Sequence, residues 1–174
     1  MLQADWQRET PRKFWDPGRN LMRSLRRHQA LANRPGLLAR IRRRYWSWSH
    51  ELWRVVTRCA IELATRIGGG LLLPHANGIT IHPDTQIGRN CTIFQNVTIG
   101  VGRPDENGRV VPGIGAGVDI SAGACIVGGI TIGHRARIGL NTVVLKDVPA
   151  NSFAVGVPAR IIPQPGFAQA DNHG

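Results

Sequence analysis

The sequence predicts a mainly β protein, a β-solenoid of six-residue repeats preceded by an N-terminal α-helical region. Two observations predict this fold class. Aliphatic residues recur at every sixth position from residue 61 onward, whereas the preceding third shows helical spacing and most of the charge. A period of six fits neither an α-helix nor a long flat strand, but it fits coils in which each hexapeptide supplies one short strand and one corner.

The repeat runs in three phases, separated by a shift of two residues and by a longer interruption. Its aliphatic positions are Ile61, Ile67, Leu73 and Ile79, then Ile81, Ile87, Ile93 and Ile99, then Ile114, Ile120, Ile126, Ile132, Ile138 and Val144. Glycine often follows the aliphatic residue, and a small residue often lies four positions after it. We expect the aliphatic side chains to fill the interior, with each coil buried against its neighbours.

Charge and aromatic residues are distributed unevenly along the 174 residues, whose formal net charge is +11. Residues 1–66 hold 15 basic and 5 acidic residues and all five tryptophans, whereas residues 67–174 hold 7 basic and 6 acidic residues. No nucleic-acid-binding motif accompanies this charge, so no nucleic-acid partner is expected. The basic, Trp-rich residues 1–60 are therefore expected to form a region separate from the solenoid.

Several other features exclude classes of protein. No apolar run reaches the length of a membrane span, and the first residues are charged where a signal peptide would be apolar. The three cysteines are isolated and form no CxxC pair, which argues against a disulfide framework or a zinc site. These features predict a cytoplasmic protein. The expected location includes the inner face of the plasma membrane.

Two helices are predicted in the N-terminal region. The first begins at Pro17, with Asp16 as its cap, and runs to about Ala32; the second spans about residues 37–57. In the second helix an apolar face recurs at helical spacing, with arginines on much of the rest. One interpretation is a cap that packs this face on the solenoid, and the other is a surface that contacts anionic membrane and lipid-linked acceptors.

Three segments carry a resemblance to a known family: LPHANGITIHP at 73–83, FQNVTIG at 94–100 and AVGVPAR at 154–160. They resemble the hexapeptide-repeat acyltransferases, and within them the serine acetyltransferase-like branch, which includes acetyltransferases of exopolysaccharide and colanic acid clusters. The resemblance covers about residues 61–162. It implies a left-handed parallel β-helix, a homotrimer or larger assembly, and acetyl-CoA bound in the groove between neighbouring helices.

With the family's three hexapeptides per coil, His75, Gln95, Ala122 and Leu140 are predicted to form one column. Nine residues beyond a hexapeptide lie within residues 101–113, where Pro, Gly, Asn and Asp predict an extruded loop. Such a loop is a usual place for function, and in the family it packs over a neighbouring active site. Residues 163–174 form a C-terminal tail.

The resemblance assigns His75 as the general base that takes a proton from an acceptor hydroxyl. Substrate-binding candidates are Gln95, Asn77 and Arg109. Candidates for binding CoA, as small residues near the pantetheine arm or as cations near the phosphates, are Gly100, Ala122, Arg137, Leu140, Lys146 and Arg160. No metal is required by this chemistry.

The sequence departs from the serine acetyltransferases at three positions. The aspartate that orients the base falls at Ala60, a second histidine falls at Val111, and the residue before the base is Pro74. Because serine would lose expected partners, these departures favour an O-acetyltransferase acting on a sugar or exopolysaccharide precursor. The alternatives are a serine O-acetyltransferase of cysteine biosynthesis and a catalytically idle trimeric scaffold.

Overall fold

A computed structural model describes residues 3–163 of the chain. It begins with the short 3-10 helix η1 (Trp6–Glu9), followed by α1 (Pro17–Ala30) and α2 (Leu37–Thr57). The strands are β1 (Ala60–Ile61), β2 (Arg66–Ile67), β3 (Thr80–Ile81), β4 (Gln86–Ile87), β5 (Thr92–Ile93), β6 (Thr98–Gly100), β7 (Gly113–Ile114), β8 (Asp119–Ile120), β9 (Cys125–Val127), β10 (Thr131–Ile132), β11 (Arg137–Ile138), β12 (Val143–Val144), β13 (Ser152–Val155) and β14 (Arg160–Pro163).

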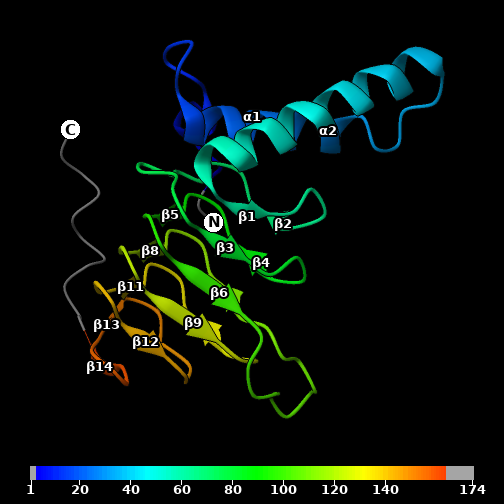
Figure 1. Cartoon of the computed structure of the whole chain (residues 1–174). Helices are drawn as coiled ribbons and strands as arrows, with labels where there is room; N and C mark the ends of the chain where they lie inside the picture. Colours follow the sequence, from blue (N-terminus) through cyan, green and yellow to red (C-terminus); the bar gives the residue numbers. More distant parts are fainter. Residues whose placement is uncertain (1–2, 164–174) are drawn as a thin grey trace.

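The short strands stack into three parallel sheets that form the sides of a β-helix (Figure 1). The first sheet runs β1-β3-β6-β9-β12, the second β2-β4-β7-β10, and the third begins β5-β8-β11-β13. Their registers place equivalent aliphatic residues of successive coils side by side, as in Ile81 against Ile99 and Ile99 against Ile126. The predicted fold class, a left-handed β-helix with an N-terminal helical region, is confirmed.

The corners explain the glycine and asparagine content of the repeat. At the corner between the second and third sheets, one residue per coil has a positive φ: Gly70, Asn90, Gly117, Arg135 and Asn151. At the corner between the third and first sheets, the residues are Gly78, Asn96, Gly123 and Asn141. Glycine adopts this conformation freely, and asparagine tolerates it better than other residues do. These two corners of each coil therefore turn on a left-handed residue.

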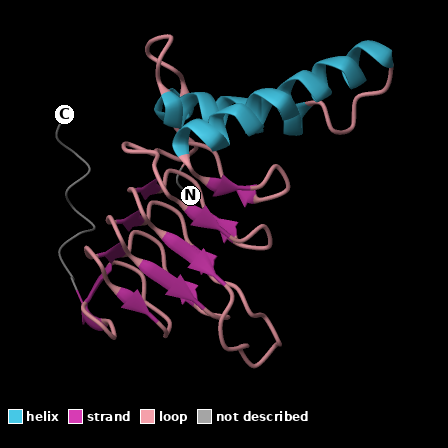
Figure 2. Cartoon of the chain, in the orientation of Figure 1, coloured by secondary structure: helices cyan, strands magenta, loops and turns pink. Residues whose placement is uncertain are grey.

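Helix α1 covers the open end of the β-helix, as Figure 2 shows. Its Leu21, Met22 and Leu25 are at most 1% exposed and join the same hydrophobic core as the coil interiors. Gly18 lies so close to the first coil that a Cβ there would be 2.6 Å from the carbonyl oxygen of Leu73. Helix α1 is thus the element that seals the first coil.

The packing of helix α2 differs from the prediction that its apolar face packs on the solenoid. The predicted span of the helix agrees with the structure, but its apolar face does not pack on the β-helix. Trp48 is 79% exposed and Leu38 is 77% exposed, whereas the buried residues of α2 are His50 and Thr57. The capping interpretation assigned the wrong face, because α2 packs against α1 through its more polar side.

Two local predictions about α1 also need correction. The helix ends at Ala30 and not at about Ala32. Asp16 precedes Pro17 as expected, but its carboxylate does not cap the helix. That carboxylate instead accepts hydrogen bonds from the backbone amide of Arg12 and from the Arg19 guanidinium.

At the far end of the β-helix, β14 turns back and pairs antiparallel with β13. This hairpin covers the last coil with the segment that resembles the family's closing motif. The predicted tail lies outside the described residues from 164 onward. Among residues 3–163, no helix combines the length and the apolar character that crossing a membrane requires.

Candidate functional site

The stacked coils bring four predicted site residues into one column. Ile93, Ile120 and Ile138 align in the third sheet, so the residues two positions later, Gln95, Ala122 and Leu140, also align. In the first coil the hydrogen bond from Asn96 N–H to the Asn77 carbonyl, 2.9 Å, puts Asn77 in this column and not His75 as predicted, because two extra residues follow Leu73. Backbone hydrogen bonds connect its coils, from Gly123 N–H to the Gln95 carbonyl at 3.0 Å and from Asn141 N–H to the Ala122 carbonyl at 2.9 Å.

His75 stands on a turn that is two residues longer than the equivalent turns of later coils. The turn is held by hydrogen bonds from Gly78 N–H to the Thr57 carbonyl, 3.1 Å, and from Ala60 N–H to the Ile79 carbonyl, 2.8 Å. The His75 side chain is exposed, and its ring centroid lies 6.3 Å from that of Phe94. Within residues 3–163 its ring nitrogens have no hydrogen-bond partner, which leaves them free to meet a substrate.

Gln95 lies one coil beyond His75 and presents an unsatisfied acceptor. Its Oε1 atom is buried and has no hydrogen-bond partner among the described residues. Leaving a buried amide oxygen without a hydrogen-bond donor costs free energy. Gln95 Oε1 is therefore suited to accept a hydrogen bond from a donor outside the described residues. Asn77 is exposed two residues after His75, and its carbonyl accepts from Asn96 N–H.

Within residues 3–163, no carboxylate takes the place of the missing orienting aspartate beside His75. Ala60 pairs with Thr80, the residue that follows the His75 turn, so position 60 does adjoin this turn. The neighbouring Glu62 instead forms an ion pair with Arg54 of α2, with an N–O distance of 3.2 Å. Glu62 is therefore paired with an arginine of α2.

Arg109 does not join His75 within one chain. Its Nε lies 3.2 Å from an Asp105 carboxylate oxygen, and one terminal nitrogen donates to Thr131 Oγ1 at 3.0 Å. This places Arg109 in the extruded loop, at the corner between the first and second sheets, away from the corner that holds His75. Val111, at the position of the missing histidine, is 5% exposed.

The residues predicted to bind CoA are spread over the later coils. Gly100 ends β6 and pairs with Val127, while Lys146 follows β12 in the same sheet. Leu140 is 71% exposed, and Arg160 begins β14. The Arg137 guanidinium lies 3.8 Å from the Asp119 carboxylate.

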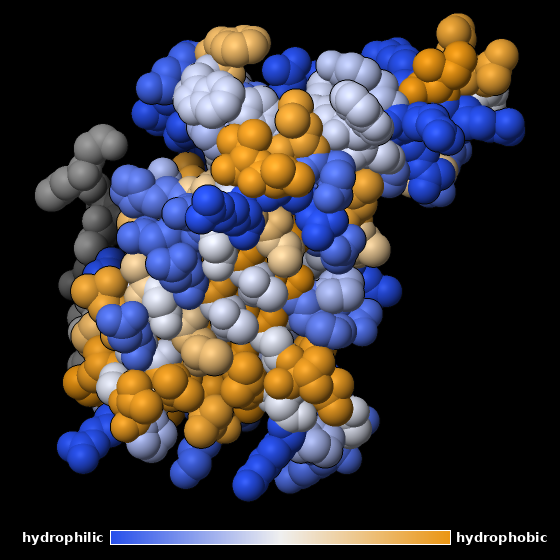
Figure 3. All heavy atoms as spheres, in the orientation of Figure 1, coloured by the Kyte–Doolittle hydropathy of each residue, from blue (hydrophilic) through white to orange (hydrophobic). Residues whose placement is uncertain are grey.

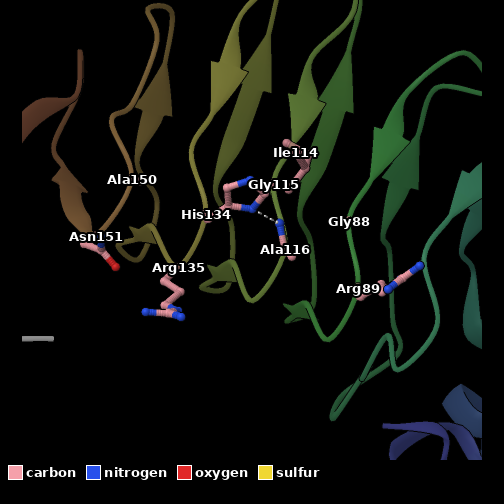
Figure 4. A pocket seen from close by; sticks show the side chains of 9 residues that line it. All are labelled: Gly88, Arg89, Ile114, Gly115, Ala116, His134, Arg135, Ala150 and Asn151. Carbon is pink, nitrogen blue, oxygen red and sulfur yellow. Dashed lines mark hydrogen bonds between the residues drawn. The ribbon is translucent and has the colours of Figure 1, made fainter. Parts of the chain in front are cut away.

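The corner between the second and third sheets forms a groove that sequence reasoning missed (Figure 4). Its volume is about 610 Å³, and its lining residues are Gly88, Arg89, Ile114, Gly115, Ala116, His134, Arg135, Ala150 and Asn151. His134 is fixed in the groove because its Nδ1 accepts from Ala116 N–H at 2.9 Å. The glycine that follows the aliphatic residue was the available signal, since Gly88 and Gly115 both line the groove.

Two buried groups outside the column have perturbed ionisation. Burial raises the pKa of the Cys91 thiol to about 11, so this cysteine stays protonated and is a packing residue. Burial lowers the pKa of His50, whose Nε2 lies 2.8 Å from the Ile61 carbonyl oxygen and whose Nδ1 lies 3.0 Å from Ser24 Oγ. His50 connects α2 to α1 and β1 and has a structural role.

Known proteins match the chain through both sequence and fold. Serine acetyltransferase 3, mitochondrial, of Arabidopsis thaliana is 43% identical over 129 residues, covering 66% of this chain and 33% of the relative. Serine acetyltransferase of Staphylococcus xylosus is 41% identical over 116 residues, covering 67% of this chain and 53% of the relative. The chain thus spans one third to about half the length of these relatives. No protein-family model matches it.

Solved structures give the same result. A serine acetyltransferase in complex with CoA superimposes with a TM-score of 0.69 and 34% identity, covering 86% of this chain and 58% of the other. Serine acetyltransferase of Neisseria gonorrhoeae in complex with serine gives a TM-score of 0.68 and 32% identity, covering 85% of this chain and 57% of the other.

These matches correct the predicted function. The preference for a sugar or exopolysaccharide acceptor is wrong, because the relatives and solved structures that the chain matches are serine acetyltransferases. The error came from giving more weight to three absent side chains than to the surrounding motifs. By the similarity of its repeats and of its three-dimensional fold, the chain belongs to the serine acetyltransferase-like branch of the hexapeptide-repeat acyltransferases.

Proposed function

We propose that the protein is a serine O-acetyltransferase that uses acetyl-CoA as donor. The observation that carries the proposal is the exposed His75 two residues before Asn77, which lies in one column with Gln95 and Ala122, in a chain similar to serine acetyltransferases solved with CoA and with serine. The exposed ring nitrogens of His75 supply a base, and the unpartnered Gln95 Oε1 supplies an acceptor for a serine N–H.

The reaction needs a base that accepts the proton of the serine hydroxyl, and it needs that hydroxyl held against the thioester carbonyl. His75 takes the proton from the serine hydroxyl as its oxygen attacks the carbonyl carbon of the acetyl thioester. Backbone N–H groups beside the bound thioester stabilise the oxyanion that forms. The C–S bond then breaks, the acetyl group stays on the serine oxygen, and the CoA thiolate receives the proton from His75.

The active assembly that we propose is a homotrimer with its sites between neighbouring β-helices. In one chain His75 is exposed and Arg109 lies at a different corner, so a single subunit leaves the column open on one side. A neighbour placed against this corner can bring the extruded loop of residues 101–113 over the column. Arg109 can then contact the carboxylate of serine bound to the next subunit.

The test is the release of CoA from acetyl-CoA with L-serine as acceptor, followed by detection of the free thiol. We expect saturable turnover with serine and a loss of about 1,000-fold or more in kcat for His75→Ala, which removes the general base and disturbs positioning. His82→Ala is the matched control, because His82 contacts its own turn through Asp84 N–H and is expected to keep near-normal turnover.

Two results would overturn the proposal. Undiminished turnover in His75→Ala would remove His75 as the base. Binding of acetyl-CoA without transfer to serine by the native protein would support a scaffold in which the site is not catalytic.

A further inference from the structure

The outer side of α2 is an apolar surface without a partner in the described chain. Its residues recur three or four positions apart, with a neighbouring pair at each end, and they face away from the protein. We define them as the α2 stripe: Leu37, Leu38, Ile41, Tyr45, Trp48, Leu52, Val55 and Val56. Their exposed fractions range from 40% at Val56 to 79% at Trp48. Figure 3 shows hydrophobic side chains over α2 on the viewed face, next to strongly hydrophilic ones.

The stripe lies opposite the side of α2 that packs on the protein. With about 100° per residue, Ile41 and the buried His50 are on opposite sides of the helix. His50 reaches Ser24 of α1 and the Ile61 carbonyl, which fixes the rotation of α2 about its axis. The stripe is therefore held outward by hydrogen bonds on the other face, and α2 cannot turn it inward without breaking them.

Arginines border the stripe on both sides. On the helix surface Arg40 and Arg44 lie along one border and Arg42 along the other. All three are exposed, and none has an ion-pair partner among residues 3–163. The one acidic residue within the span of the stripe, Glu51, lies on the border of Arg40 and Arg44 and forms an ion pair with Arg54, with an N–O distance of 3.0 Å. The exposed surface of α2 is thus apolar in the middle and cationic along its edges.

We propose that the α2 stripe docks on the surface of an anionic lipid bilayer, with α2 lying in the plane of the interface. An interfacial helix has this combination of an apolar face, aromatic residues and flanking basic residues. The apolar side chains enter the headgroup boundary, while the arginines contact lipid phosphates. Helix α2 has 21 residues and is about 30 Å long, so it offers an extended contact.

Charge favours this occupant over a second copy of the chain. Two stripes packed together would bring their arginine borders close to each other, and the single acid of each α2, Glu51, already pairs with Arg54. An anionic surface compensates the same arginines. Covering the stripe with another α2 is therefore the competing outcome, and the experiment distinguishes it.

The experiment is flotation of the full chain with vesicles of phosphatidylcholine and phosphatidylglycerol, compared with vesicles of phosphatidylcholine alone. We expect binding to the anionic vesicles that weakens at high salt. Near an anionic surface one basic residue raises partitioning about fivefold, so Arg40→Gln/Arg42→Gln/Arg44→Gln is expected to lower it about 100-fold. The charge-matched control is Arg66→Gln/Arg89→Gln/Arg103→Gln, whose exposed arginines lie on the β-helix.

A second pair of variants tests the apolar part of the surface. Ile41→Ser/Trp48→Ser is expected to lower binding at least tenfold, whereas Val101→Ser/Leu145→Ser, which removes comparably exposed residues elsewhere, leaves it unchanged. Circular dichroism confirms that each variant is folded. Acetyl transfer to serine without vesicles is measured separately, so failure of the proposed function is distinguishable from failure of docking.

Three outcomes would overturn the docking proposal. One is equal binding to neutral and anionic vesicles. Another is an equal loss in the control and α2 arginine variants, which would indicate adsorption through net charge. The third is no vesicle binding together with a smaller assembly in Ile41→Ser/Trp48→Ser by sedimentation, which would show that another copy covers the stripe.

Discussion

The carboxylate of Glu9 in η1 and the guanidinium of Arg26 in α1 form a bidentate ion pair, with N–O distances of 2.8 and 2.9 Å. Glu9 is 5% exposed and also accepts from the backbone amides of Gly70 and Leu71. Arg26 donates in addition to the carbonyls of Ile67 and Gly68. One pair of side chains thereby satisfies four backbone groups of the first coil, which has no preceding coil to bond to.

Glu9→Gln is expected to destabilise the protein by about 2–4 kcal/mol, because it leaves Arg26 without its buried counter-charge. At this chain length that corresponds to a fall of about 5–15 °C in Tm, measured by thermal unfolding. Glu106→Gln is the control, since Glu106 is exposed in the loop of residues 101–113. Equal Tm values for the two variants would contradict the role of Glu9 in sealing the coil.

Stability is expected to fall in mild acid because of His50. Burial lowers the pKa of His50 in the folded protein, so below its unfolded value of about 6.5 the unfolded chain binds more protons. The contribution of neutral His50 is thus complete above about pH 6.5 and is lost as the pH falls toward the lowered pKa. Urea unfolding from pH 7.5 to 5 measures this slope.

In His50→Gln the same slope is expected to be smaller by at most about 1.4 kcal/mol per pH unit, the value for one proton. The variant is also less stable at pH 7.5, because it loses contacts of the imidazole. His134→Gln serves as the comparison, since His134 is exposed on the β-helix. An unchanged slope in His50→Gln would assign the acid sensitivity to other groups.

The corner at Gly123 is expected to reject a side chain. Gly123 has a φ of +72°, and a Cβ there would collide with Asn141 Oδ1 of the next coil. Gly123→Ala should therefore cost about 2–3 kcal/mol, from backbone strain and from the collision. Gly108→Ala is the matched control, because Gly108 has a φ of +76° but nothing within 4 Å of its added Cβ.

The difference between the two alanine variants isolates the collision from the cost of the positive φ. Combining Gly123→Ala with Asn141→Gly removes the colliding amide and is expected to recover part of the loss in urea unfolding. Additive losses in the double variant would show that the two positions do not interact.

Gln95→Leu is expected to raise the KM for serine about 10- to 100-fold with a smaller change in kcat, because it removes a buried acceptor without removing the base. Steady-state kinetics of thiol release measure both constants. Gln86→Leu, at an exposed position of β4, is the control. A change confined to the KM for acetyl-CoA would assign Gln95 to the donor.

Ala60→Asp is expected to raise kcat for serine about tenfold. Position 60 adjoins the turn that carries His75, where a carboxylate can orient the imidazole and stabilise its protonated form. Ala64→Asp adds the same charge at an exposed position and should have no effect. An unchanged kcat in Ala60→Asp would show that another group already orients His75.

The buried positions of the repeat could be predicted from sequence because each depends on the spacing of residues within one short coil. An aliphatic residue at every sixth position buries itself wherever the coil closes, and the confirmed registers follow from counting residues between Ile61 and Ile138. The same counting places Gln95, Ala122 and Leu140 in one column, but it fails at His75, because the two extra residues after Leu73 put Asn77 there.

Contacts between distant segments could not be predicted in this way. The choice of which face of α2 packs was wrong because hydrophobicity alone favours burying the α2 stripe, whereas His50 fixes the opposite side through hydrogen bonds to Ser24 and Ile61. The partner of Glu62 depends on where Arg54 lies after α2 has docked. The Glu9–Arg26 pair joins residues 17 positions apart that share no motif.

The coils of the β-helix are evenly spaced along its axis, so the number of coils between two residues sets the distance between them. Adjacent parallel strands are spaced by about 4.8 Å, so the three steps from Asn77 to Leu140 measure about 14 Å along the axis. Deleting or adding one coil between Gln95 and Ala122 would therefore shift Ala122 and Leu140 by one coil spacing along the axis. Gln95 and the residues before it would keep their positions. The number of coils thereby sets the length of molecule that the column can span.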